Sequence, residues 1–242
     1  MTLKIHDIGA ANHIPKHLLT LGNESCFVHF DPDERGLNNL KNNYPFDKAT
    51  KVRETAQFIK IALGDKKEKR LLNLAKKNTG SSFFNIENNN LEGVMEVEVW
   101  PHKEYIKFNN IPPPDVIKID VEGFEMQVLK GIDLLDKTLR SVEVEVTLSH
   151  QSLGDIINLM NSKGFQIMKL AVHGDQRKNP RSFIRGKVHG LMYYLKLQKF
   201  QFQKCTSVGA FDSVSTQLLQ IELVFMRPEV IDSDNVVDKK IR

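Results

Sequence analysis

The sequence predicts an α/β fold, in which helices cover both faces of a mostly parallel β-sheet. Two observations support this fold class. Over roughly the first sixty residues, apolar segments of strand length alternate with segments of helical periodicity. Near the middle of the chain, the segment 116–131 begins as an apolar strand, passes through two acids and a glycine, and continues with apolar residues at helical spacing. α/β enzymes often bind their ligand at such a change from strand to helix.

The N-terminal part of the chain predicts three strands separated by two helices. Pro15 suits the first turn of a helix that we expect to end near Leu21, and Asp33 can cap the helix after the second strand. Strand–helix–strand connectivity of this kind is typical of a parallel sheet. The strands are expected at 3–8, 25–30 and 58–63, and the second helix at about 34–43.

The next part of the chain predicts accessory structure outside the central sheet. The charged run 66–77 indicates a solvated loop or an edge hairpin, because charge runs are usually exposed. An Asn-rich loop at 85–93 leads to alternating apolar and acidic residues at 95–99, the pattern of a half-buried strand. A short helix at 102–108 and a rigid proline connector at 112–114 are expected to follow.

After the central strand and its helix, the segment 142–148 alternates valines with polar residues. The valines share one face, and Glu143, Glu145 and Thr147 share the other. If this strand lies inside the sheet, one of the glutamates should point into a polar cavity, since a buried charge needs polar surroundings. The remaining elements are expected to be a helix at 155–162, a strand at 165–172, a basic segment at about 173–204 and a strand at 221–226.

Length and charge limit the classes of protein to consider. The 242 residues suit one α/β domain, which we expect to span 1–228, with the accessory hairpin or loop at about 66–110 and a polar tail at 229–242. The net charge of +4 comes from 34 basic and 30 acidic residues that are interspersed, so composition alone does not require a nucleic-acid partner.

Cysteine usage and hydropathy predict a cytoplasmic protein. Cys26 and Cys205 are far apart and have neither metal-ligand nor disulfide-framework spacing, which favours a reducing compartment. The N-terminal residues do not have the pattern of a signal peptide, and no stretch approaches the roughly 20 apolar residues of a membrane span.

Five separated motifs occur in a fixed order along the chain. They are Asp7-Ile8-Gly9-Ala10, Phe30-Asp31-Pro32, Ala62-Leu63-Gly64, Ser81-Ser82 and Lys118-Ile119-Asp120-Val121-Glu122-Gly123-Phe124-Glu125 with the Gly131 that follows. In this order they resemble the motifs of the FkbM family of S-adenosylmethionine-dependent methyltransferases, over about residues 3–172. One motif alone would be weak, whereas the combination is specific. The resemblance implies a Rossmann-like class I methyltransferase, with seven mostly parallel strands, an antiparallel last strand and S-adenosylmethionine as cofactor.

The resemblance also implies a set of cofactor-binding residues. Gly9 would let the backbone approach the cofactor closely, and Asp31 would accept hydrogen bonds from the ribose hydroxyls. Asp7 would lie near the amino group of the methionine moiety. The complete expected set is Asp7, Gly9, Ala10, Asp31, Ala62 and Leu63.

The acceptor side is expected at the carboxyl end of the central strand. Asp120 and Glu122 can each deprotonate a hydroxyl, bind a sugar hydroxyl or cap the next helix, and these alternatives stay open. His150 is a further candidate base, and Lys118 is expected to pair with a carboxylate. Substrate contacts are expected from Glu145, Ser81 and Ser82. No spacing of histidines and acids requires a metal ion.

The sequence therefore predicts O-methylation of a hydroxyl on a glycan or a secondary metabolite. Two alternatives remain. His13 stands where related enzymes carry a second glycine, which raises the alternative of an inactive binding protein with the same fold. The basic segment 177–204 raises the alternative of a nucleic-acid methyltransferase. A nicotinamide oxidoreductase is disfavoured, because the first turn lacks G-x-G-x-x-G.

Overall fold

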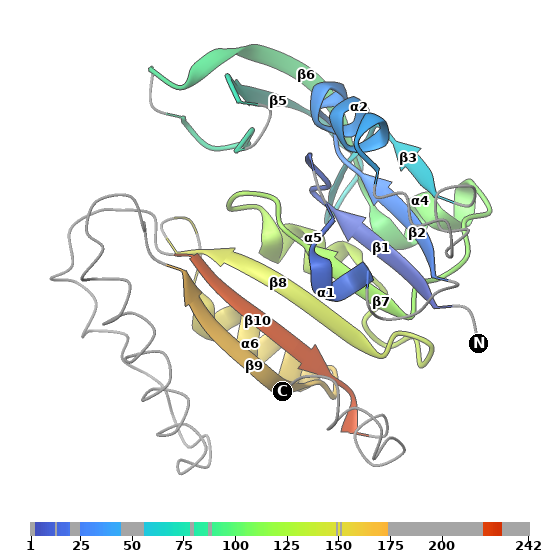
Figure 1. Ribbon diagram of the computed structural model, residues 1–242. Helices are drawn as coiled ribbons and strands as arrows, with labels where there is room; N and C mark the ends of the chain where they lie inside the picture. Colours follow the sequence, from blue (N-terminus) through green and yellow to red (C-terminus); the bar gives the residue numbers. More distant parts are fainter. Residues whose placement is uncertain are drawn as a thin grey trace, which may run out of the picture.

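A seven-stranded sheet runs through the molecule and carries helices on both faces (Figure 1). The computed structural model describes residues 3–12, 14–19, 25–44, 56–77, 80–86, 89–148, 150, 152–173 and 220–228. The predictions made for His13, for the helix end near Leu21, for Cys205, for the basic segment beyond His173 and for the tail lie outside these residues. Within them, no helix is long and apolar enough to cross a membrane.

The order of the strands in the sheet is β3-β2-β1-β7-β8-β10-β9. The first five of these pair in parallel, and β10 pairs antiparallel with both of its neighbours. This confirms the expected mostly parallel sheet with an antiparallel last strand. The strands are β1 Lys4–Ile8, β2 Cys26–Phe30, β3 Gln57–Ile59, β7 Val116–Ile119, β8 Ser141–Thr147, β9 Gln166–His173 and β10 Gln220–Met226.

Helices cover each face of the sheet with apolar side chains. On one face, Leu18 of α1 (Lys16–Leu19) and Leu40 of α2 (Glu34–Asn42) pack in one cluster with the sheet residue Phe27. On the other face, a larger cluster joins the sheet to α5 (Glu125–Gly131) and α6 (Leu153–Ser162), and α4 (His102–Phe108) lies beside it. Asp33 caps α2 as predicted, since its side chain accepts a hydrogen bond from the Arg35 backbone N–H.

A second, three-stranded sheet has the order β4-β6-β5 and projects beyond the first (Figure 1). Its strands are β4 Ala62–Gly64, β5 Glu68–Ala75 and β6 Leu91–Pro101. The charged run predicted as a loop or an edge hairpin is therefore an edge hairpin. The prediction of one strand at 58–63 is wrong: a tight turn at Lys60, closed by an Ile61 N–H bond of 3.1 Å to the Ile59 carbonyl, divides it between the two sheets.

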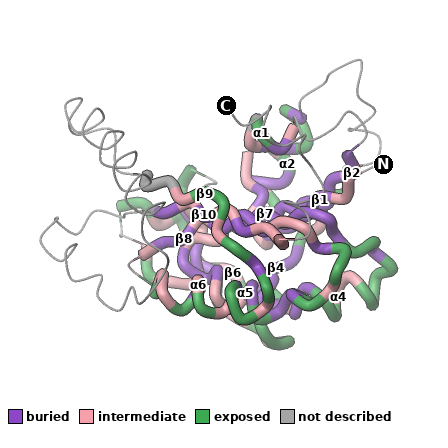
Figure 2. The backbone as a smooth tube through the Cα atoms, turned by 90° about the horizontal axis from the view of Figure 1, so that it is seen from below, coloured by how far each residue is buried: buried purple, intermediate pink, exposed green. Residues whose placement is uncertain are grey.

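The second sheet is anchored to the core by close backbone contact. A Cβ atom on Gly131, at the end of α5, would lie 1.8 Å from the Gly64 carbonyl oxygen of β4, so this contact requires glycine. Leu72 and Val99 of the hairpin join the same apolar cluster as the central strand β7. In Figure 2 the strands at the centre of the molecule are coloured as buried, whereas much of the surrounding helices and loops is exposed.

Candidate functional site

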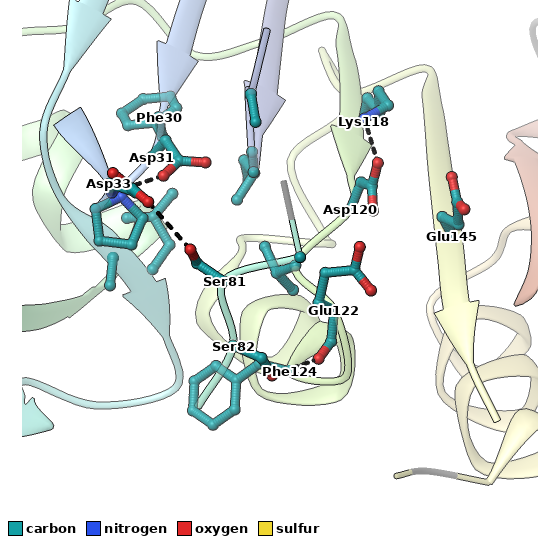
Figure 3. Close-up of a pocket in the computed structure, with 18 of the residues that line it drawn as sticks. Phe30, Asp31, Asp33, Ser81, Ser82, Lys118, Asp120, Glu122, Phe124 and Glu145 are labelled. Atoms are coloured by element: carbon teal, nitrogen blue, oxygen red, sulfur yellow. Dashed lines mark hydrogen bonds and ion pairs between the residues drawn. The ribbon is translucent and has the colours of Figure 1, made fainter. Parts of the chain in front are cut away.

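A cavity of about 410 Å³ opens at the carboxyl edge of the parallel strands (Figure 3). Gly9 follows β1, Asp31 follows β2 and Asp120 follows β7, and all three line the cavity. The site therefore lies where open α/β sheets bind ligands, and its volume falls in the usual range of small-molecule pockets.

Gly9 allows two loops to meet at the floor of this cavity. It has a φ of 82°, and a Cβ atom at this position would lie 1.8 Å from the Asp120 carbonyl oxygen. Its N–H donates to the Phe30 carbonyl at 2.8 Å, while the Asp120 N–H donates to the Ile8 carbonyl at 2.9 Å. Only glycine fits this backbone conformation and this contact, so the predicted role of Gly9 in close backbone approach has a clear structural basis.

Asp31 lies at the end of β2, almost fully buried, with its carboxyl group at the cavity (Figure 3). One carboxyl oxygen accepts a hydrogen bond of 2.7 Å from the Asp33 N–H. The pKa of Asp31 is raised to about 7, mainly by burial and also by the nearby carboxylates of Asp33, Asp7 and Asp120, whereas the bond from the Asp33 N–H opposes the shift. Hydrogen bonds from the hydroxyl groups of a ligand would stabilise this carboxyl group.

An apolar wall adjoins Asp31. Ile61, Ala62 and Leu63 come from the turn before β4 and from β4 itself, and Leu72 and Phe83 come from the hairpin and its loop. Apolar side chains next to an acid suit a nucleoside, whose flat base is largely apolar and whose ribose is polar. Ala62 and Leu63 were predicted on the family motif, whereas the contribution of the hairpin was not.

A buried charge network lies beneath the cavity and crosses three strands. The Lys118 ammonium lies 3.1 Å from a carboxyl oxygen of Asp120 and 3.7 Å from one of Asp7. Asp7 also bonds His29 at 3.0 Å, and His29 reaches the Tyr44 hydroxyl at 3.1 Å. The expected pairing of Lys118 with a carboxylate is thus present in this network.

In this network, nearby opposite charges together shift the pKa of Asp7 and of Lys118 more than burial does. Burial alone would raise the pKa of Asp7, but Lys118 and the hydrogen bond from His29 hold it below its usual value. Burial alone would lower the pKa of Lys118, but Asp120 and Asp7 raise it. Lys118 is therefore a permanent cation at the site. Asp7 is not among the residues that line the cavity, because it lies behind Lys118 within the sheet.

The acidic turn after β7 presents Glu122 to the cavity. The carboxyl groups of Asp120, Glu122 and Glu145 face a common space, across the cavity from Asp31 (Figure 3). Glu122 has a φ of 52°, and Gly123 follows with a φ of 107°. Glu125 accepts the Gly123 N–H at 2.8 Å, and burial raises the pKa of Glu125 to about 8 although this bond opposes the shift.

The serine pair lies between Asp31 on one side of the cavity and Glu122 on the other (Figure 3). The Ser81 hydroxyl donates to Asp33 at 3.0 Å and accepts the Ala75 N–H at 3.1 Å. The Ser82 hydroxyl donates to the Glu122 carbonyl at 2.7 Å. Both serines line the cavity, as expected for substrate-binding residues, but their hydroxyls bond the protein itself. Their contact with a substrate stays a prediction.

Strand β8 contributes two acids to the cavity, and α1 contributes a histidine. Glu143 and Glu145 both line the cavity, as the alternation in this strand predicted for at least one of them. His17 lies 2.6 Å from Glu143, and this hydrogen bond raises the pKa of His17. Sequence reasoning missed His17, because the single turn of α1 has no periodicity to mark it. It also assigned Asp33 only a capping role, although this residue lines the cavity.

Two of the other predicted site residues lie away from the cavity lining. The His150 ring stacks on Phe84, with ring centroids 4.2 Å apart, and lies against Gly123. Ala10 is 1% exposed and belongs to the apolar cluster under α1 and α2. Their predicted roles in catalysis and cofactor binding stay predictions. Among the described residues, no three His, Cys, Asp or Glu side chains converge to form a metal site.

Comparison with known proteins identifies a family. Residues 7–167 match the family described as "Methyltransferase FkbM domain". This match covers most of the chain and confirms the family resemblance, and with it the expected S-adenosylmethionine as cofactor.

Individual relatives are distant. A curated relative, the hexuronic acid methyltransferase AglP of Haloferax volcanii, is 36% identical over 55 residues, which are 23% of each chain. The structure of a methyltransferase FkbM from Methylobacillus flagellatus matches with 19% identity and a TM-score of 0.46, over 69% of this chain and 39% of that one. A methyltransferase from Geobacter sulfurreducens, in complex with S-adenosyl-L-homocysteine, matches with 11% identity and a TM-score of 0.41, over 93% and 85%. The chain thus spans less than half the length of the first two proteins.

Proposed function

Because the chain belongs to the FkbM methyltransferase family, we propose that it is an S-adenosylmethionine-dependent methyltransferase that methylates a hydroxyl oxygen of a glycan or a secondary metabolite. One observation carries the proposal. A single cavity joins a half suited to a nucleoside, at Asp31, to a wall of carboxylates at Asp120, Glu122 and Glu145. A methyltransferase needs these two halves side by side, since the methyl group passes directly from donor to acceptor.

The residues of the first half fit the cofactor. The apolar wall of Ile61, Ala62 and Leu63 would hold the adenine, and Asp31 would accept the ribose hydroxyls. Gly9 itself has no side chain, and its backbone lines the cavity directly. The acidic lining also suits a cofactor that carries a sulfonium and an amino group, because opposite charges attract strongly in a partly buried site.

The residues of the second half would prepare the acceptor. When bound, S-adenosylmethionine supplies a methyl group that is already activated for transfer. The chain then has to position the acceptor hydroxyl and accept its proton as the new bond between oxygen and methyl forms. A carboxylate oxygen of Asp120 or Glu122 would take that proton. Lys118 would keep Asp120 oriented through their 3.1 Å contact.

Two observations favour a sugar as acceptor. The carboxylates at the acceptor side are good partners for several neighbouring hydroxyl groups, because each oxygen can accept more than one hydrogen bond. The curated relative is described as a hexuronic acid methyltransferase, although its similarity covers only 23% of this chain. An acceptor that carries its own carboxylate would meet like charges at Glu122 and Glu145, so we place neutral sugars first.

The cofactor half is tested by calorimetry with purified protein and S-adenosylmethionine. We expect wild-type protein to bind, and Asp31→Ala to bind about tenfold more weakly or worse, since a hydrogen bond to a charged group contributes roughly 1.5–3 kcal/mol. Asp65→Asn is the matched control, because Asp65 is an exposed acid in the turn after β4 and does not line the cavity. Unchanged affinity of the Asp31 variant would contradict the ribose assignment.

The acceptor half is tested by methyl transfer from isotopically labelled cofactor. The panel contains neutral methyl glycosides, hexuronic acid glycosides and short RNA and DNA oligonucleotides. We expect label in the neutral glycosides and less in the hexuronic acids. Label in the oligonucleotides alone would replace the glycan proposal with nucleic-acid methylation. Cofactor binding without transfer to any member would favour an inactive binding protein.

A further inference from the structure

The acidic turn after β7 contains an unusual backbone conformation. Glu122 and Gly123 both have positive φ, at 52° and 107°. Glycine adopts this region readily, whereas a glutamate there is strained by contact between its Cβ atom and the backbone. A strained residue persists only where the surrounding structure holds it, and such residues concentrate at functional sites.

Glu125 bonds the backbone of this turn, and Glu122 lines the cavity. The helix α5 begins after this turn, and the acid that bonds the turn backbone is Glu125, which accepts the Gly123 N–H at 2.8 Å. The N-cap residue, Phe124, makes no side-chain capping bond. Glu122 instead directs its carboxyl group into the cavity (Figure 3). Of the roles considered for this residue, the structure therefore favours contact with a ligand.

The second sheet holds the strained turn from outside. Ser82 donates to the Glu122 carbonyl at 2.7 Å, and it is itself fixed by a pair of backbone hydrogen bonds with Asn73 of β5, at 2.9 and 3.0 Å. The Phe84 N–H donates to the same hydroxyl at 3.1 Å. Ser82 is 7% exposed, so these bonds are shielded from water.

Gly123 is confined by two aromatic rings. A Cβ atom there would lie 2.8 Å from the His150 ring and 3.0 Å from the Phe84 ring, and these two rings stack in parallel. The stack leaves room for a glycine backbone and nothing larger. Two contacts therefore hold the turn in place. Ser82 bonds the Glu122 carbonyl, and the Phe84–His150 stack packs on Gly123.

We propose that these contacts hold the Glu122 carboxylate in the cavity, where it contacts the methyl acceptor. In this proposal Ser82 is a positioning residue that acts through the Glu122 backbone. The inference rests on the proposed function. It gives the hairpin sheet a role in the acceptor site: the sheet supplies no reacting group and fixes the turn that does.

The backbone strain is tested without any ligand, by thermal unfolding of Glu122→Gly and Glu122→Ala. Both variants lose the carboxylate, and only glycine relieves the strain, so we expect the glycine variant to melt about 2–4 °C higher than the alanine variant. Lys130, exposed in α5, is the matched control. There the order should reverse, because glycine destabilises a helix relative to alanine. The same order at both positions would overturn the strain argument.

The positioning role is tested with Ser82→Ala and Ser82→Thr, using calorimetry with S-adenosylmethionine and transfer to the neutral methyl glycosides. We expect the alanine variant to keep cofactor affinity within about threefold and to lose tenfold or more in kcat/KM for the glycoside. The threonine variant, which keeps the hydroxyl, should restore most of that loss. Equal losses in cofactor affinity and in transfer, or no rescue by threonine, would overturn the positioning role.

The two levels of the proposal fail in different ways. If wild-type protein does not bind S-adenosylmethionine, the proposed function falls, and the acceptor role of Glu122 falls with it. If wild-type protein binds the cofactor and methylates a glycoside, but Glu122→Gln transfers as fast as wild type, only the role of Glu122 is overturned. The thermal comparison decides on the strained turn in either case.

Discussion

The two faces of the seven-stranded sheet differ in chemistry along the same strands. Towards α5 and α6, the strands β7 and β8 present apolar side chains, such as Ile119 and Val144. Towards α1 and α2, the neighbouring residues of these strands are Lys118 and Glu143, both buried. The apolar face supplies hydrophobic stability. The other face gathers buried charges next to the cavity.

The character of the side chains on the charged face also changes along its strands. Near the amino ends of the strands it is apolar, with Ile5, Phe27 and Val116 packed under the helices. Near the carboxyl ends it carries Asp7 and Lys118. Buried ion pairs are weak evidence for stability, because desolvation offsets much of their attraction. These buried charges lie at the cavity edge, where their desolvation is offset by their mutual contacts.

The largest effect on the free energy of unfolding should come from removing a buried charge from the charged face. Lys118→Met removes the cation that lies 3.1 Å from Asp120 and 3.7 Å from Asp7, and leaves the buried Asp7 carboxylate with only its bond to His29. We expect the free energy of unfolding to fall by about 3–5 kcal/mol, the usual effect of breaking a buried pair from one side. Urea denaturation measures this value.

The neighbouring residue on the apolar face provides the control for this variant. Ile119 is fully buried, and Ile119→Val should cost only about 0.5–1.5 kcal/mol, because it removes one methyl group. If Lys118→Met costs no more than Ile119→Val, the buried charges are not interdependent and the contrast between the two faces fails.

A smaller, pH-dependent effect on the free energy of unfolding should come from two buried histidines beside α4. His6 and His102 are buried there and share a 2.8 Å hydrogen bond. Burial lowers the pKa of His102 from 6.5 to about 4 and that of His6 well below 6.5. As pH falls from about 6.5 to about 4, the unfolded chain takes up protons that the folded protein excludes. Stability is therefore lost over this window, by about 3 kcal/mol for His102 alone.

Urea denaturation across this pH range, with two histidine variants, measures that loss. His102→Gln should flatten the dependence of unfolding free energy on pH between 4 and 6.5. His17→Gln is the control, because the hydrogen bond to Glu143 raises the pKa of His17. The stability from His17 is fully present below pH 6.5 and is lost as pH rises above it, so this variant should leave the acid window unchanged. An unchanged slope in His102→Gln would contradict the assignment.

The smallest effect should come from an ion pair outside both faces. Lys60 and Glu34 pair at 2.8 Å on the surface, and both side chains are more than half exposed. Lys60→Gln should change the free energy of unfolding by less than about 1 kcal/mol, since solvent screens such pairs. A loss as large as that of Lys118→Met would mean that burial is not what separates the two classes of ion pair.

Much of the fold was predictable from the sequence, because strand and helix periodicities are local. The alternation of valine and glutamate in β8 predicted both an apolar face and acids at a cavity, and both are present. The division of 58–63 between two sheets was not predictable. Its apolar residues continue across the break at Lys60, and hydrophobic pattern does not record which sheet a strand joins.

The site was predictable only where a motif fixes the backbone. Gly9, Asp31 and Asp120 line the cavity as expected, because each directly follows a parallel strand, and Glu122 lies in the turn after β7. The contribution of His17 and the stacking of His150 on Phe84 depend on contacts between distant segments. Such contacts leave no signal in a single sequence.

The contact between Gly64 and Gly131 has a consequence for how this chain can vary. No side chain lies between the carbonyl of β4 and the end of α5, so main-chain contact sets the distance between this strand and this helix. The connection between β5 and β6, by contrast, carries Ser82 and Phe84, which contact the acidic turn, so an insertion or deletion there would displace that turn and alter the site.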